Sequence, residues 1–131
     1  MVRELAGLTS LLLLAACSRS FPVEATFEDG HIVFNAKEKL NGCLYHFSVS
    51  ASNGEMMWSV WGDFKSTPCD DLFPIIYGVV PEGLTERSRP KPLKEGISYR
   101  IEGSDGDRYY GAFSYSRTIV VENRPEIARA P

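Results

Sequence analysis

The chain carries three cysteines, Cys17, Cys43 and Cys69, and two histidines, His31 and His46. Nucleophiles, acid–base groups and metal ligands are often residues of these two types. Neither a Gly-x-Ser-x-Gly nucleophile motif nor a His-Glu-x-x-His zinc motif occurs in the sequence. Cys69 follows Cys43 by 26 positions, which excludes a Cys-x-x-Cys redox pair. We therefore expect a protein that is not an enzyme and that needs no cofactor.

Cys17 directly follows an uncharged, largely apolar stretch over residues 5–16, and Arg3 and Glu4 precede that stretch. As a helix, the stretch rises by about 18 Å. A membrane-spanning helix must cross a hydrocarbon core of about 30 Å. Residues 1–16 are therefore typical of a secretory signal peptide rather than of a membrane span.

The tetrad Leu14-Ala15-Ala16-Cys17 resembles the lipobox of bacterial lipoproteins, and the chain is similar to the small lipoproteins of proteobacteria. In that family the cysteine thiol receives a diacylglycerol, the peptide before the cysteine is removed, and the new amino group usually receives an acyl chain such as palmitate. The resemblance implies that residues 1–16 are cleaved, that Cys17 is lipidated and that residues 17–21 tether the domain to the membrane. Ser18, rather than Asp, follows the cysteine, which favours the periplasmic face of the outer membrane. An ordinary signal peptide with a chance cysteine is the alternative.

The other two cysteines, Cys43 and Cys69, are then expected outside the cytoplasm, where two cysteines in a small domain usually pair. In the chain-entropy model, a disulfide closing this loop contributes about 3.5 kcal/mol. We expect this bridge, and two buried free thiols are the alternative. The net charge of −3, together with the expected address, argues against a nucleic-acid partner.

The elements that must position these residues are short strands. Over residues 22–122, apolar and polar positions alternate in short stretches between turn signals such as Asp29-Gly30, and no helix longer than one turn is indicated. We expect one all-β domain, a β-sandwich of seven to eight antiparallel strands. Residues 123–131 contain two prolines and lack periodicity, and we expect a flexible tail.

Leu93, Gly96 and Tyr99 follow one another in the stretch 92–99. This spacing resembles the tyrosine corner of fibronectin type III and related Ig-like sandwiches. The resemblance covers residues 58–122. It implies that the Tyr99 hydroxyl bonds to backbone near the turn and that Leu93 closes the end of the core. The three strands expected before Trp58 and the expected disulfide depart from that family.

Two features predict a binding surface. Trp58 and Trp61 lie on opposite faces of one expected strand, so both cannot enter a one-sided core. Downstream, four cations without an intervening acid alternate with prolines, and these are Arg87, Arg89, Lys91 and Lys94. Such a stiff basic stretch is suited to a phosphate-bearing envelope glycolipid or an acidic partner, and a solubilising loop is the alternative.

Aromatic residues near these positions add a second possible contact. Trp61, Tyr110 and Tyr115 could bind a glycan or a protein, although aromatic pairs across a sheet more often serve packing. Asp105 and Asp107 lie in a turn like the start of a calcium loop, but the further ligands and the closing Glu are missing. We therefore expect no metal site.

These observations favour an envelope-anchored module that binds or scaffolds another protein or a glycan. The alternative is an inhibitor or immunity protein against a periplasmic hydrolase, in which Asp70 and Asp71 would enter a basic cleft. A hydrolase or a carbohydrate-active enzyme is the third interpretation. Its candidate groups, His31 and His46, are better explained as solvated strand residues.

Overall fold

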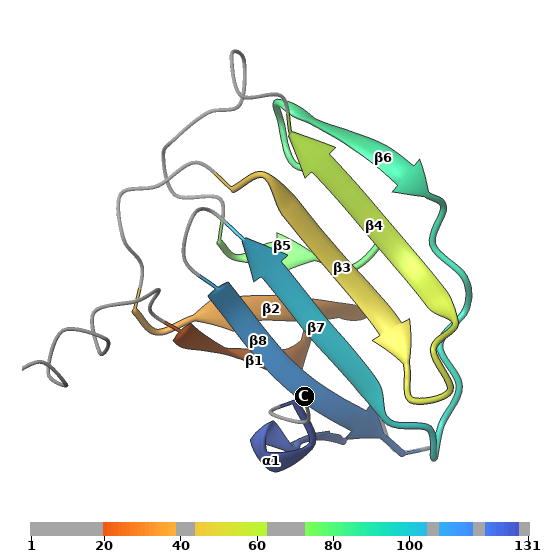
Figure 1. Ribbon diagram of the computed structural model, residues 1–131. Coiled ribbons are helices and arrows are strands. Elements are labelled where there is room, and N and C mark those ends of the chain that lie inside the picture. Colours follow the sequence, from red (N-terminus) through yellow and green to blue (C-terminus); the bar gives the residue numbers. More distant parts are fainter. Residues whose placement is uncertain (1–19, 39–43, 63–72, 105–107, 117–119, 129–131) are drawn as a thin grey trace, which may run out of the picture.

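The computed structural model describes residues 20–38, 44–62, 73–104, 108–116 and 120–128 (Figure 1). Cys17, Cys43 and Cys69 lie outside these ranges, so the lipid anchor and the disulfide stay predictions. Asp70 and Asp71, named above for an inhibitory loop, also lie outside the described residues, as do Asp105 and Asp107, for which no metal site was expected.

The described residues form nine strands and one short helix. In chain order these are β1 (Ser20–Glu28), β2 (His31–Ala36), β3 (His46–Ala51), β4 (Met56–Gly62), β5 (Ile75–Ile76), β6 (Leu84–Ser88), β7 (Tyr99–Ser104), β8 (Arg108–Tyr115), β9 (Val121–Asn123) and α1 (Pro125–Ala128). The all-β class expected from the sequence is confirmed. No helix in the described ranges is both long and apolar enough to cross a membrane.

The strands form one curled, mixed sheet with the order β5-β2-β1-β8-β7-β3-β4-β6, and β9 pairs with β8 (Figure 1). The expectation that all strands are antiparallel is wrong, because β1 pairs parallel with β8 over residues 20–22. From Val23 onward, β1 instead pairs antiparallel with β2. Alternation of apolar residues reports which face is buried, but not the direction of the neighbouring strand.

The hairpin between β1 and β2 forms as its turn residues predict. Asp29 and Gly30 have φ values of 49° and 83°, and Glu28 pairs with His31 across the turn. Two consecutive residues with positive φ give a turn whose twist matches that of the flanking strands. Local turn chemistry therefore fixes the register of β1 against β2.

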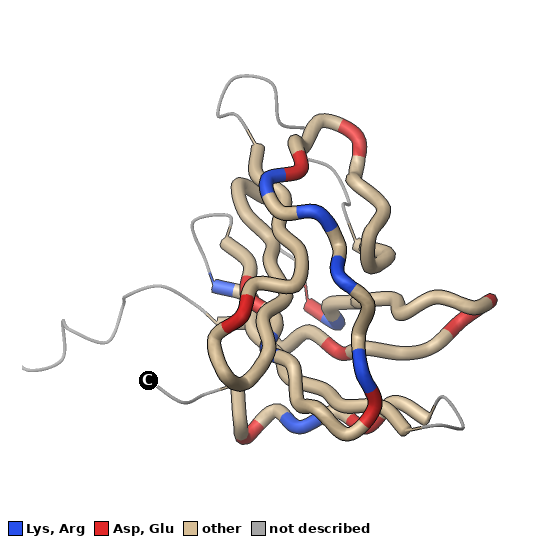
Figure 2. Tube along the Cα trace, turned by 90° about the vertical axis from the view of Figure 1, so that its right-hand side faces the viewer, with Lys and Arg blue, Asp and Glu red and all other residues tan. Residues whose placement is uncertain are grey.

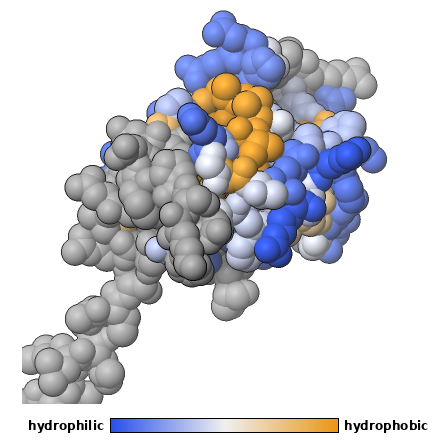
Figure 3. Space-filling model, turned by 90° about the horizontal axis from the view of Figure 1, so that it is seen from above, coloured by the Kyte–Doolittle hydropathy of each residue, from blue (hydrophilic) through white to orange (hydrophobic). Residues whose placement is uncertain are grey.

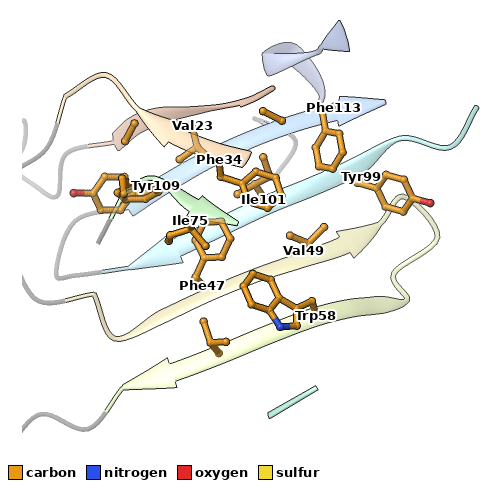
Figure 4. Packing of buried hydrophobic residues seen from close by; sticks show 14 of the residues in the cluster. Val23, Phe34, Phe47, Val49, Trp58, Ile75, Tyr99, Ile101, Tyr109 and Phe113 are labelled. Atoms are coloured by element: carbon orange, nitrogen blue, oxygen red, sulfur yellow. The ribbon is translucent and has the colours of Figure 1, made fainter. Parts of the chain in front are cut away.

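The core lies inside the curl and is built around aromatic rings (Figure 4). Phe34 of β2 lies 5.4 Å from Phe47 of β3 and 5.6 Å from Phe113 of β8, measured between ring centroids. Phe47 in turn lies 6.1 Å from Trp58 of β4. All four side chains are completely buried, so aromatic contacts join β2 to strands that it does not pair with.

The two tryptophans of β4 separate as their alternation requires. Trp58 is completely buried, and its indole Nε1 donates a hydrogen bond to the Glu86 carboxylate at 3.1 Å. Trp61 is 39% exposed on the opposite face. The prediction that one tryptophan stays outside the core is confirmed.

The structure differs from the expected tail over residues 123–128. The Ala25 backbone N–H donates to Asn123 Oδ1 at 2.8 Å, and Asn123 Nδ2 donates to the Ala25 carbonyl at 3.0 Å. Helix α1 follows, with Ala128 buried against Tyr110 and Ala112 of β8. An amide side chain can hydrogen-bond to a strand backbone wherever it lies in the sequence. The alternation of apolar residues therefore could not predict this contact. Residues 129–131 lie outside the described ranges.

Gly111 permits the crossing of β1 over β8. A Cβ atom at this position would lie 2.3 Å from the Val23 carbonyl oxygen, at the point where β1 leaves β8 for β2. That oxygen belongs to backbone and cannot rotate away, so only glycine fits here.

We predict that Gly111→Ala lowers the free energy of unfolding by about 2–3 kcal/mol, because β1 must move away from β8. Urea unfolding at equilibrium measures this change. Ser114→Ala on the same strand is the control and is expected to stay within about 0.5 kcal/mol of the wild type. A Gly111→Ala variant as stable as this control would contradict the close approach.

Candidate binding surface

The outer face of the sheet gathers Trp61, His46 and Arg87, which we call the Trp61 cluster. Trp61 of β4 pairs directly with His46 of β3, and their ring centroids lie 4.5 Å apart. The Arg87 guanidinium carbon of β6 lies 4.9 Å from the centroid of the Trp61 ring. Such a cation–π contact contributes about 0.5–1 kcal/mol at an exposed site.

The structure brings together two residues that the sequence had singled out separately, Trp61 and Arg87, and adds His46. His46 was expected to be a solvated strand residue, but it is half-buried and its ring lies tilted against the indole. The register of β3 against β4 places His46 opposite Trp61. A prediction of that register would have found this contact. Because Arg87 covers part of the indole ring, the cluster offers a cation as well as aromatic surface.

Burial lowers the pKa of His46 below its ordinary value of 6.5, and the nearby Glu102 carboxylate opposes this shift only in part. The imidazole is therefore neutral at pH 7. At that pH, the positive charge of the Trp61 cluster comes from Arg87 alone.

A second surface follows the chain between β6 and β7. Its exposed cations are Arg87, Arg89, Lys91 and Lys94, which we call the basic edge. Figure 2 shows Lys and Arg positions one after another along this connection, which runs down the right side of Figure 1. Lys91 Nζ pairs with the Glu55 carboxylate at 3.0 Å. Within the described ranges, Arg89 and Lys94 have no ion pair.

Three tyrosine hydroxyls hold the backbone of this connection, and we call Tyr77, Tyr99 and Tyr115 the tyrosine clamp. The Tyr77 hydroxyl donates to the Lys91 carbonyl at 2.7 Å, and the Tyr115 hydroxyl donates to the Leu93 carbonyl. The Lys94 N–H donates to the Tyr99 hydroxyl at 2.6 Å. Backbone groups that would otherwise point at solvent are thus paired with side chains from three separate parts of the chain.

The bond that the sequence predicts for Tyr99 is present, since its hydroxyl also donates to the Lys94 carbonyl at 3.3 Å. Leu93 packs against the core, and Gly96 occupies the turn with a φ of 79°. The roles of Tyr77 and Tyr115 were missed. Tyr77 follows β5 by one residue and Tyr115 ends β8, and no local motif joins either residue to the connection.

Burial raises the pKa of Tyr77 to about 12 and also raises the pKa of Tyr115. For Tyr77, the hydrogen bond to the Lys91 backbone opposes the shift. Both phenols therefore keep their protons at neutral pH and act as donors.

Apolar side chains are exposed elsewhere, and Figure 3 shows such a patch on the face seen from above. Exposed large hydrophobic residues in the described ranges are Phe27, Met56, Trp61, Val79, Val80 and Val120. A groove of about 350 Å³ lies behind the basic edge and is lined by Phe27, Gly30, His31, Ile32, Tyr77, Pro92, Leu93 and Tyr115. Through Pro92 and Leu93, the groove adjoins the connection that carries the cations.

In the part of the chain that the structure describes, no three His, Cys, Asp or Glu side chains are placed to hold a metal ion. Comparisons with protein-family models, with curated proteins and with solved structures found no match. Function is therefore inferred from the residues before β1 in the sequence and from the two surfaces.

We predict that Tyr99→Phe lowers the free energy of unfolding by about 1–2 kcal/mol, because the partly buried Lys94 N–H loses its acceptor. Lys94→Ala is the matched control. It removes an exposed side chain but keeps the backbone N–H, and we expect a change within about 0.5 kcal/mol. Urea unfolding separates the two, and equal losses would contradict a role for the hydroxyl.

We predict that His46 makes stability depend on pH. Because its pKa is lower in the folded than in the unfolded state, the unfolded chain takes up the proton first. The contribution of His46 is complete above about pH 6.5 and is lost as the pH falls below that value.

The free energy of unfolding at pH 7.5 and at pH 5.5 tests this dependence. The His46→Gln variant should lose less stability between these pH values than the wild type. The exposed His31→Gln variant should behave as the wild type does. If both variants retain the wild-type difference between the two pH values, His46 is not the responsible group.

Proposed function

We propose that the protein is a lipid-anchored module of the bacterial cell envelope that binds or scaffolds another envelope component without catalysing a reaction. The tetrad Leu14-Ala15-Ala16-Cys17 supports the anchor and the envelope address. With a lipid on Cys17, the tether would be shorter than the expected residues 17–21, because β1 already begins at Ser20. Two or three acyl chains hold a protein firmly, because each buried methylene contributes about 0.8 kcal/mol. The periplasmic face of the outer membrane is the proposed location.

A single observation carries the binding proposal, which is that the exposed cations lie on a backbone held by the tyrosine clamp. A solubilising loop needs no fixed backbone. Chain segments that are already ordered lose less conformational entropy when a partner binds, so fixed surfaces favour binding. The Trp61 cluster adds a stacked cation and indole on the adjoining sheet face.

The finer fold is part of the same proposal. We infer an Ig-like or fibronectin-like sandwich, in which β5, β2 and β1 form the smaller layer. Contacts of Phe34 with Phe47 and Phe113 support it, because they join β2 face to face with β3 and β8. Ig-like modules serve many functions, so this fold alone selects none.

Cell fractionation tests the proposal. We predict that the wild-type chain is recovered in the outer-membrane fraction and that Cys17→Ser moves it to the soluble fraction or to its precursor form. Mild solubilisation of the membranes should recover a stoichiometric partner with the wild type, and Trp61→Ala/Arg87→Gln should reduce that recovery.

Ser18→Ala serves as the control and should leave the chain in the membrane. A processed chain found in the aqueous fraction with an unmodified first residue would overturn the anchor. Recovery of a secreted hydrolase that the chain inhibits would replace the scaffolding role by an inhibitory one.

A further inference from the structure

We propose that the basic edge binds a linear acidic polysaccharide located away from the membrane that holds the N-terminus. The statement that the polysaccharide lies away from the membrane rests on the proposed anchor at Cys17. Binding of the polymer itself rests only on Arg87, Arg89, Lys91 and Lys94 and on the backbone that carries them.

The basic edge presents its charges as a row rather than as a pocket. Arg87 lies in β6, and Arg89 and Lys91 follow at every second position beyond the end of that strand at Ser88. All three side chains are exposed. Pro90 fixes the backbone angle φ between the second and third cations. The Lys91 N–H donates to the Met57 carbonyl at 3.0 Å, which holds the row against the start of β4. A row of charges matches a polymer with repeated anionic groups better than a single compact anion.

Carboxylates near the basic edge neutralise it only in part. Glu55 pairs with Lys91, and both side chains are about half exposed. The Glu86 carboxylate accepts a hydrogen bond from the buried Trp58 ring. Glu95 follows Lys94 in the chain. The cations at positions 87 and 89 therefore remain available to an anion, although the protein as a whole carries a net charge of −3.

The basic edge lies in a different part of the sheet from Ser20, the described residue nearest to the proposed anchor. β8 begins at Arg108, which pairs with Ser20, and ends at Tyr115, which holds Leu93. β8 spans about 23 Å between these two residues, so the Lys94 end of the basic edge lies far from Ser20 along the strands. The Arg87 end is separated from Ser20 by the strands β8, β7, β3 and β4, which lie between β1 and β6 in the sheet. Figure 1 shows the start of β1 on the left and the connection from β6 to β7 on the right. Charges are screened over about 8 Å at physiological ionic strength, so lipid head groups near Ser20 would contribute little.

Binding of polygalacturonate, a linear polymer with one carboxylate per sugar, tests the proposal. The full chain is held in micelles of a non-ionic detergent, and affinity is measured by isothermal titration calorimetry, with neutral dextran as the uncharged polymer. We expect Arg89→Gln/Lys94→Gln to weaken binding of polygalacturonate about tenfold. Higher salt should weaken binding by the wild type.

Matched variants separate the position of the charges from their number. Lys37→Gln/Arg108→Gln removes two exposed cations elsewhere in the described chain and should stay within about twofold of the wild type. Arg89→Lys/Lys94→Arg keeps both charges and should retain binding. Near-ultraviolet circular dichroism checks that each variant is folded.

Three results would overturn the proposal. The first is that Arg89→Gln/Lys94→Gln and Lys37→Gln/Arg108→Gln weaken binding of polygalacturonate equally. The second is that dextran binds as tightly as polygalacturonate. The third is that the chain binds phosphatidylglycerol vesicles but not the polymer. The same titration can be repeated with Cys17→Ser, which lacks the proposed site of lipidation. A failed anchor would therefore leave polymer binding intact, whereas a failed basic edge would leave the membrane fractionation unchanged.

Discussion

Three tyrosine hydroxyls bonded to one short stretch of backbone are the constraint on which the exposed edge of this molecule depends. Residues 89–98 join β6 to β7 along the side of the curled sheet, and backbone bonds hold this stretch at Lys91, Gly96 and Ser98. Tyr77, Tyr99 and Tyr115 add hydroxyl partners from three separate parts of the chain. With its backbone occupied by the protein, the connection turns its long charged side chains towards solvent.

The same constraint links the fold to the proposed role in the envelope. The sheet encloses an aromatic core, and the phenol groups reach from the side of that core to the surface. Trp61 and Arg87 extend the charged area onto the outer face of β4 and β6. A small domain with a mildly negative net charge thereby keeps one ordered cationic area, and such local areas, rather than net charge, select partners.

Features of the fold that rest on neighbouring residues could be predicted from the sequence, and features that rest on distant pairs could not. The turn at Asp29 and Gly30 and the bond of Tyr99 to Lys94 each lie within a few residues. By contrast, Asn123 pairs with Ala25 across 98 positions, and His46 meets Trp61 only through strand register. The basic edge was visible as composition, but its fixed backbone required Tyr77 and Tyr115, which no spacing connects to it.

The parallel contact of β1 with β8 has a mechanical consequence. A tether at the N-terminus and a partner at the basic edge would pull on opposite ends of β8, because Ser20 pairs with its first residue and Tyr115 lies at its last. The force would then run along the strands, and the interstrand hydrogen bonds lie across that direction. Bonds loaded in this way share the tension instead of opening one after another, so a domain anchored and loaded at these two points would resist shear.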